Sequence, residues 1–466
     1  MREGIHIWLR KLKKTIRIFN YLIMIKTLCL GIFYISVNTV MSQESFSLTE
    51  AKKAAVENSA SVKSAQIDVD IANRKVWETK AIGLPQINAE AGFQQFIDIP
   101  TQVIPAKAFN PFASENEMME VQFGTEYTAS ANLTVSQLLF DGRYLIGLKA
   151  VQMFTQVSQQ SLVKSEKIAK EEVEDAYYMV VVSREQVVIL VKTKDKLQKL
   201  MTDIQILADE KVLEQTEADQ IALNFKRLEN SLVLARKQNE LATDLLKLKM
   251  GFNLEKQIEA SDSLSTFIDV FDPGKYLNLQ FDAAKNIDVQ LLETQLALDA
   301  LNIKNEQAAG IPSLAAFFQT QQQAYRNEFN FFSNRPWYPA NIWGINLNLP
   351  IFSSGQRNAK VKQAELSRDK TELLIGSVEE GLRLQVKNVK VNLKASWDLM
   401  QSNKQGMIIA ERILNSGQIK FKEGIISSTD FTQIENQFIQ AQSDYINSAY
   451  QMLKSKLELD KLTVNE

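Results

Sequence analysis

Proline positions set the strongest constraint on how this chain can fold. None of the nine prolines lies between Phe112 and Asp272, and none follows Pro350. Because proline is the strongest helix breaker, two stretches of more than a hundred residues can form uninterrupted helix. From 143 to 250 and from 356 to 462 these stretches are rich in Ala, Leu, Lys, Glu and Gln, with apolar residues every three or four positions. The pattern predicts long amphipathic helices.

Each helical stretch contains one interruption. In the segment 422–430, Gly424 can take the left-handed conformation that ends a helix, and Ser427 or Ser428 can cap the next helix. This segment therefore predicts a tight helical hairpin. The interruption at 208–217 has no glycine. It predicts either a second hairpin or one continuous coiled coil.

Between the helices the apolar period changes to two, which is typical of two-faced strands. Strands are predicted at 86–93, 123–136 and 343–351, with a weaker one at 313–321. Strands of about ten residues match the length that crosses an outer membrane at a tilt, and two soluble hairpins are the alternative. One face is expected to line water and the other to meet lipid. The water-facing set is Gln86, Asn88, Glu90, Glu126, Thr128, Asn132, Asn346 and Asn348, and the lipid-facing set is Ile87, Phe93, Tyr127, Leu133, Ile345 and Leu347.

Three aromatic residues near the last strand predict a belt at one membrane boundary, since amphipathic rings prefer the headgroup level. They are Trp337, Tyr338 and Trp343. Packing of these rings within an extracellular loop is the alternative.

The chain repeats itself. Residues 83–94 align with 310–321 at an offset of 227, and 139–143 align with 351–357 at an offset of 212 to 214. Two repeats are predicted, 43–250 and 283–466, each with a helix, two strands and a long helical hairpin, joined by a connection at 251–282. The strands are expected to become helices at Phe140 and Gly142 in the first repeat, and at Phe352 and Gly355 in the second.

The first 42 residues resemble an export signal. Five basic residues between positions 10 and 17 precede a mostly apolar run from 18 to 37, and cleavage is expected after Ser42. The signal starts at Met1 or Met24. An uncleaved anchor is the alternative, because the apolar run is close to the length of a membrane span.

Removing residues 1–42 changes the formal net charge from −2 to −8 and removes Cys29 and His6, the only cysteine and histidine. An acidic chain lacks the clustered basic surface that nucleic-acid binding requires. Without Cys or His, thiol or imidazole catalysis and Cys/His metal sites are impossible. The carboxylates recur at helical spacing among Lys and Gln, as on a solvated helix face. We therefore predict no catalytic, cofactor or metal site.

Four strands cannot close a membrane barrel, because closure takes about eight and an open edge cannot face lipid. Several copies must therefore share one barrel. Helices of fifty to sixty residues that continue from those strands would extend it by roughly 80 Å, the scale of a duct across a periplasm.

The duplicated halves resemble the TolC-like outer-membrane efflux proteins. The resemblance rests on the strand entries Leu84-Pro85-Gln86 and Ile311-Pro312-Ser313, the strand exits Phe140-Asp-Gly142 and Phe352-Ser-Ser-Gly355, and the run 424–430. It implies an α+β membrane protein, a homotrimer with a twelve-stranded β-barrel in the outer-membrane lipid and a long α-helical barrel in the periplasm. It also implies docking to a periplasmic adaptor, and through it to an inner-membrane pump or a type I secretion ATPase.

In this family the hairpin tips contact the adaptor and close into an acidic constriction. The resemblance implies gate residues Asp430 and Glu217, although an acid in the first turn of a helix is also favoured by the helix dipole alone. Gln433 stands where relatives carry a second acid, and Lys211 replaces the usual turn glycine of the first tip. The implied adaptor contacts are Gly424, Ile425, Ile426, Ser427, Val212, Leu213 and Thr216.

A structural or adhesive coiled-coil protein of the envelope is the alternative function, and so is the adaptor itself. A coiled-coil adhesin would lack the alternating strands, and an adaptor would not be duplicated. The exported substrate does not follow from the sequence, because a passive tunnel has no shaped pocket for its cargo.

Overall fold

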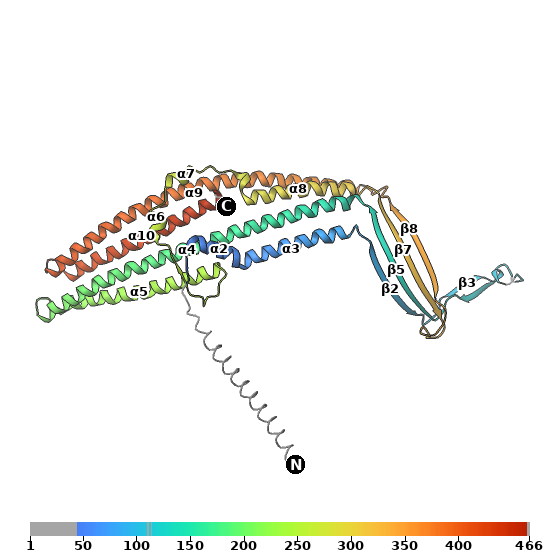
Figure 1. The fold of residues 1–466 in the computed structure, drawn as a ribbon, viewed down its shortest axis with the longest axis horizontal. Coiled ribbons are helices and arrows are strands. Elements are labelled where there is room, and N and C mark those ends of the chain that lie inside the picture. The colour runs from blue at the N-terminus through green and yellow to red at the C-terminus, as the bar shows by residue number, and fades with distance from the viewer. Residues whose placement is uncertain (1–43, 110, 113, 464–466) are drawn as a thin grey trace, which may run out of the picture. The chain divides into compact units, whose positions relative to one another are not determined.

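A computed structural model describes residues 44–463 except 110 and 113 (Figure 1). The predicted signal segment 1–42 lies outside these described residues. The described chain forms two compact units. We name residues 44–55, 172–271 and 403–450 the hairpin unit, and residues 56–171, 272–402 and 451–463 the sheet unit. Both units contain elements from both halves of the sequence.

The sheet unit contains a four-stranded antiparallel sheet in the order β2-β5-β7-β8. Its strands are β2 (Gln86–Gln95), β5 (Tyr127–Phe140), β7 (Ser313–Arg326) and β8 (Tyr338–Asn348). The predicted strands therefore exist and pair with one another. The two edge strands, β2 and β8, each pair on one side only within the described residues.

The register sorts the strand residues into two faces, because directly paired residues point to the same side of a sheet. One face holds the predicted polar set, namely Gln86, Asn88, Glu90, Thr128, Asn132, Asn346 and Asn348. The opposite face holds the predicted apolar set, namely Ile87, Phe93, Tyr127, Leu133, Ile345 and Leu347. Glu126, the remaining residue of the predicted polar set, lies outside the sheet, because β5 begins one residue later, at Tyr127.

Each of the four strands differs from its prediction at one boundary or more. β2 ends at Gln95 rather than 93, β5 at Phe140 rather than 136, and β7 at Arg326 rather than 321. β5 begins at Tyr127 rather than at 123. β8 spans Tyr338–Asn348 rather than 343–351, because its partner β7 begins at Ser313, opposite Asn348. Beyond Asn348 there is no β7 backbone to pair with, so periodicity continues where the ladder has ended.

The three aromatic residues predicted to form one belt are divided between the two faces of the sheet and the segment before β8. Trp343 pairs with Phe318 on the apolar face, whereas Tyr338 pairs with Gln323 on the polar face. Trp337 precedes β8 and its ring lies 6.5 Å from that of Phe331 in the preceding loop. The three rings therefore do not share one surface.

The loop between β2 and β5 contains a hairpin that the sequence pattern did not predict. It consists of β3 (Thr101–Pro105) and β4 (Met118–Gln122), with the short 3-10 helix η1 (Ala106–Ala108) after β3. The hairpin forms a separate two-stranded sheet (Figure 1).

The first strand-to-helix junction is as predicted: β5 ends at Phe140 and α4 (Gly142–Asp209) begins at Gly142. In the second, Phe352 lies in an irregular segment, and α9 (Gln356–Lys422) begins just after Gly355. Gly355 has a φ of 84°, in the left-handed region that favours glycine.

The glycines before the first strand of each half have a packing role. A Cβ at Gly83 would collide with the Tyr144 hydroxyl, and one at Gly310 with the Arg357 guanidinium. Tyr144 and Arg357 each lie two residues after a junction glycine, so the same close approach occurs in both halves. This explains why the Gly-x-Pro segments align.

The other sheet-unit elements are the helices α3 (Ala60–Ala81), α7 (Pro273–Leu277) and α8 (Ile287–Ala308), and the short 3-10 helix η2 (Ala283–Lys285). Asn286 caps α8, because its side-chain oxygen accepts a hydrogen bond from the Asp288 amide. No helix among the described residues is long and apolar enough to cross a membrane.

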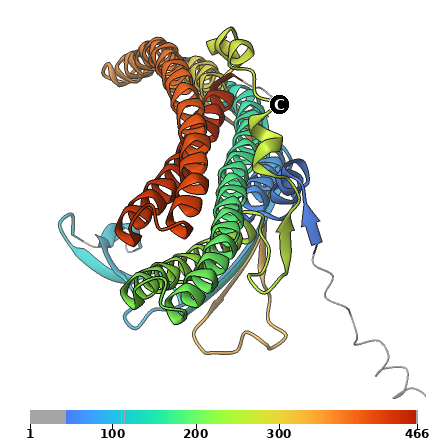
Figure 2. The same cartoon turned by 90° about the vertical axis from the view of Figure 1, so that its left-hand side faces the viewer.

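The hairpin unit contains residues 172–209 of α4 and residues 403–422 of α9. It also contains all of α5 (Gln215–Lys249) and the part of α10 (Ser428–Thr463) up to residue 450. Figure 2 shows the two hairpins, α4 with α5 in green and α9 with α10 in red. All four helices contribute to one apolar core, which includes Leu200, Ile204, Ile221, Leu228, Leu414, Phe421 and Phe431. The two hairpins are therefore packed against each other.

The remaining elements of this unit surround Tyr177. They are α2 (Leu48–Asn58), α6 (Leu264–Ile268) and the parallel strands β1 (Glu44–Phe46) and β6 (Ile258–Ala260). The Tyr177 hydroxyl lies 2.8 Å from the Phe46 carbonyl oxygen and 2.7 Å from Asp262 Oδ2. Asp262 Oδ2 also accepts a hydrogen bond from the Leu48 amide, so this tyrosine joins the N-terminal segment to α4.

Candidate functional site

The second hairpin tip turns through a glycine. Gly424 has a φ of 70°, and its amide donates to the Phe421 carbonyl at 3.0 Å. The Ile425 amide donates to the Lys420 carbonyl at 2.8 Å. These two bonds form a Schellman motif, the usual way for a helix to end at a left-handed residue.

The first hairpin tip uses the same motif without a glycine. Lys211 has a φ of 61°, its amide donates to Ala208 at 3.0 Å, and the Val212 amide donates to Leu207 at 2.8 Å. The predicted second hairpin is therefore confirmed, and the continuous coiled coil is wrong. Lys211 and Gly424 are 213 residues apart, which agrees with the offset of the repeat.

The apolar tip residues divide into two kinds. Val212 is 66% exposed and Ile425 is 64% exposed, and these two occupy equivalent positions in the motifs. Leu213 and Ile426, one residue later in each turn, are partly buried against the core shared by the hairpins. Each tip thus presents one outward apolar side chain.

Asp430 is exposed and forms a capping box with Ser427. Its carboxylate accepts hydrogen bonds from the Ser427 amide at 3.3 Å and from Ser427 Oγ at 2.8 Å, and its own amide donates to Ser427 Oγ at 3.1 Å. These reciprocal bonds satisfy amides at the start of α10. Asp430 therefore has a local structural partner, as the alternative reading of an acid in a first helical turn requires.

Glu217 occupies the equivalent position of the first tip but makes a different contact. Its Oε2 accepts a hydrogen bond of 2.6 Å from the amide of Ser428, on the other hairpin. Ser428 is only 5% exposed. A carboxylate from α5 thus caps the first turn of α10, where the helix dipole favours negative charge. The sequence places the two acids alike, whereas the structure gives them different partners.

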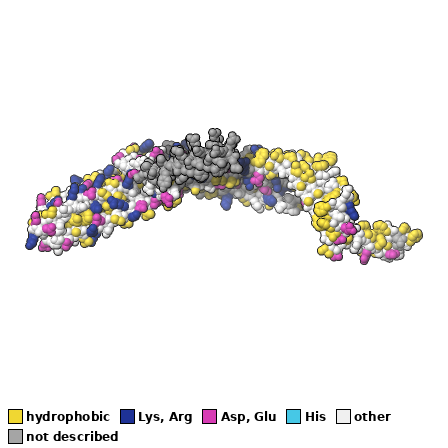
Figure 3. Space-filling view, turned by 60° about the horizontal axis from the view of Figure 1, so that its bottom comes forward, with side chains coloured by type: hydrophobic (Ala, Val, Ile, Leu, Met, Phe, Trp, Pro, Cys, Tyr) yellow, Lys and Arg dark blue, Asp and Glu magenta, His cyan; other side chains and the backbone are white. Residues whose placement is uncertain are grey.

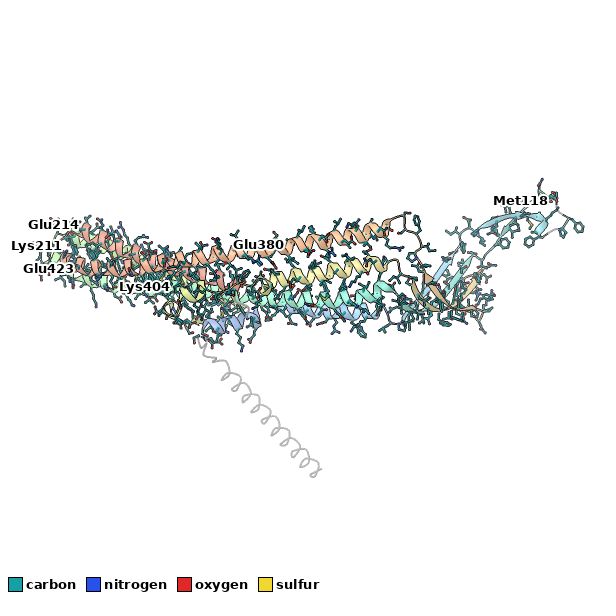
Figure 4. All side chains as sticks on the ribbon, turned by 90° about the horizontal axis from the view of Figure 1, so that it is seen from above. Met118, Lys211, Glu214, Glu380, Lys404 and Glu423 are labelled. Atoms are coloured by element: carbon teal, nitrogen blue, oxygen red, sulfur yellow. The ribbon has the colours of Figure 1, made fainter. Side chains whose placement is uncertain are left out.

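Further polar contacts connect the two hairpins. Asn224 donates to Thr432 Oγ1 at 2.7 Å, Lys196 pairs with Glu411 at 3.0 Å, and Lys422 pairs with Asp203. The remaining tip residue of the prediction, Thr216, is exposed and its hydroxyl bonds Glu214 within its own turn. Figure 4 shows Lys211, Glu214 and Glu423 together at the hairpin tips.

The structure also identifies an acid that the sequence analysis missed. Glu435 on α10 is 4% exposed and lies on the buried stripe between Phe431 and Phe438. Burial raises the pKa of Glu435 to about 7, and a hydrogen bond from Asn224 opposes that rise. The sequence does contain a signal for this burial, namely the spacing of Phe431, Glu435 and Phe438. Positions i, i+4 and i+7 of a helix share one face.

The second half of the chain matches a known family. Residues 282–464 match the family model of the outer membrane efflux protein. The chain carries an outer membrane efflux protein domain. The resemblance to TolC-like outer-membrane efflux proteins, predicted from the duplicated motifs, is thereby confirmed.

Solved structures of channel proteins share the fold outside the matched domain as well. CusC gives a TM-score of 0.68 at 14% identity, with 92% of this chain and 96% of CusC covered. The Campylobacter jejuni CmeC outer membrane channel gives 0.66 at 15% identity, with 89% and 85% covered. The open Neisseria gonorrhoeae MtrE outer membrane channel gives 0.65 at 15% identity, with 89% and 88% covered. A search of curated protein sequences finds no match.

Proposed function

We propose that this efflux protein is one subunit of a homotrimeric outer-membrane channel. Three sheet units form a twelve-stranded β-barrel in the lipid, and the helices form a tunnel in the periplasm. The channel is a passive duct that gives cargo from an inner-membrane pump an exit to the outside. A periplasmic adaptor docks to it and connects it to that pump.

The observation that carries this proposal is the exposed apolar face of the four-stranded sheet. Ile87 is 68% exposed and Leu347 is 65% exposed, and both lie on the face opposite the polar strand residues. Hydrophobic side chains gather over the strand-bearing end, whereas charged side chains are spread over the hairpins (Figure 3). An apolar sheet face of this size needs a covering, and lipid provides it.

The edge strands supply the second argument. β2 and β8 leave backbone groups unpaired, which hydrocarbon does not tolerate. Pairing of β2 of one copy with β8 of the next satisfies those groups and closes the barrel. In this proposal each subunit consists of two similar repeats, 43–250 and 283–466, joined by the connection 251–282. Each repeat contributes one pair of strands and one helical hairpin.

The hairpin tips are the proposed periplasmic mouth. The exposed Val212 and Ile425 are the apolar contacts for the adaptor, and Asp430 and Glu217 contribute the acidic gate. The neighbouring Gly424, Ile426, Ser427, Leu213 and Thr216 shape the same surface. The similarity of the two Schellman turns supports an adaptor that contacts both tips in the same manner.

Fractionation and planar-bilayer recording test this function together. We expect heat-resistant oligomers in the outer-membrane fraction that dissociate to the mature monomer on full denaturation, and stepwise conductance by the purified oligomer. A soluble, monomeric or non-conducting protein would favour the structural or adhesive coiled-coil protein instead.

A further inference from the structure

Glu435 is an acid buried between the two hairpins. It projects from α10 in the stripe of Phe431 and Phe438, which are 0% and 4% exposed. Phe431 stacks on Phe421 of α9 with 5.4 Å between ring centroids. A carboxyl group in such surroundings is costly to ionise.

The polar partner of Glu435 comes from the other hairpin. Asn224 of α5, itself 5% exposed, donates to Thr432 Oγ1 at 2.7 Å, less than one turn before Glu435 on α10. The amide of Asn224 also opposes the rise in the pKa of Glu435 that burial causes. Glu435 therefore lies directly at a polar connection between α5 and α10.

Within residues 44–463, leaving aside positions 110 and 113, no ion pair compensates the charge of Glu435. The neighbouring turns of the packed helices carry charges that are paired elsewhere or exposed. On α4, Lys194 pairs with Glu229, Lys196 with Glu411, and Asp203 with Lys422. The exposed charges are Asp195 and Lys199 on α4, Lys226 and Arg227 on α5, Arg412, Lys420 and Lys422 on α9, and Asp430 on α10 itself.

We propose that Glu435 is a proton-operated latch between α5 and α10. In its neutral form it holds the two hairpin tips packed together, and loss of its proton loosens them. The latch is a property of the hairpin unit. Only its location at a periplasmic mouth rests on the proposed function.

The direction of the pH effect follows from proton linkage. Packing raises the pKa of Glu435 from 4.5 to about 7, so the packed tips bind the proton more tightly than separated tips do. Packing is therefore favoured most at low pH and is weakened as pH rises toward and through 7. We expect the opening equilibrium of the tips to increase on the order of tenfold between pH 5.5 and pH 8.

Hydrogen–deuterium exchange of the purified protein in detergent measures this opening. After correction for intrinsic exchange rates, amides of 217–228 and 428–438 should lose protection between pH 5.5 and pH 8. Glu435→Gln keeps the size and removes the charge, so it should stay protected at both pH values. Asp444→Asn, an exposed acid-to-amide change on the same helix, should behave like the wild type.

A second variant keeps the test independent of how well Glu435→Gln folds. Asn224→Leu removes the hydrogen bond that opposes the rise in pKa, so the midpoint of the protection change should move to higher pH. A wild type without pH-dependent protection, or a Glu435→Gln variant with the wild-type dependence, would overturn the latch. Exchange is measured whether or not the protein conducts, so loss of conductance would contradict the proposed channel function and leave this result intact.

Discussion

At the scale of single residues, the first tip stores backbone strain that the second avoids. Lys211 has a φ of 61°, whereas the equivalent residue of the second tip is Gly424. A left-handed conformation costs a residue with a Cβ about 1 kcal/mol or more, and glycine pays little of it. The Schellman bonds hold Lys211 in place despite that cost.

Lys211→Gly should therefore stabilise the first tip by about 1 kcal/mol, less the extra entropy that glycine has in the unfolded chain. The measurement is amide-exchange protection of residues 207–217, with Lys211→Ala as the control that keeps a Cβ. Equal protection in the two variants would show that the left-handed conformation is not what limits the stability of this turn.

The two tip acids call for charge-neutral variants as well as truncations. If three copies converge at a mouth, Asp430→Asn with Glu217→Gln should weaken cation selectivity and block by multivalent cations, since a ring of like charges attracts cations. These variants retain an oxygen acceptor for the Ser427 and Ser428 bonds. Selectivity is measured as reversal potential in planar bilayers.

The corresponding alanine variants separate the structural roles of the same acids. Asp430→Ala removes the acid's half of a local capping box, which typically costs about 0.3–1 kcal/mol of helix stability. Glu217→Ala removes a bond between hairpins, so exchange should increase in both tips. Unchanged selectivity in the neutral pair would mean that these acids serve only as caps and that the constriction lies elsewhere.

At the scale of secondary-structure elements, the sheet register supplies a prediction for each face. Single cysteines can be placed in residues 43–466, which contain none, at Asn88 and Asn346 on the polar face and Ile87 and Ile345 on the apolar face. The first pair should react with a water-soluble thiol reagent in membranes, and the second pair should be protected by lipid. Equal labelling of all four sites would contradict a membrane barrel.

At the scale of the whole molecule, the free edges of the sheet predict how copies join. A cysteine at Ala89 on β2, combined in turn with cysteines along β8, should give disulfide-linked dimers and trimers on oxidation. A closed ring of three allows no larger species. Matched pairs on β5 and β7, which are neighbours within one chain, should remain monomeric. A continuing ladder of higher oligomers would indicate an open assembly.

Much of this architecture follows from sequence, because its causes are local. Periods of three to four and of two depend on neighbouring residues, and they gave the long helices and the four strands. The Gly424 turn and the Ser427 to Asp430 capping box also lie within a few residues of chain. The duplicated glycines likewise mark positions where each half repeats the same packing.

Other features were decided only by tertiary structure, because their partners lie far away in the sequence. β8 ends where β7 no longer offers a partner, although its alternation continues. Glu217 bonds Ser428, 211 residues later, and Glu435 is buried against Asn224, also 211 residues away. A residue's spacing shows which side of its own helix it occupies. Its burial and its charge state depend on which second helix covers that side, and this is settled only when the two hairpins pack.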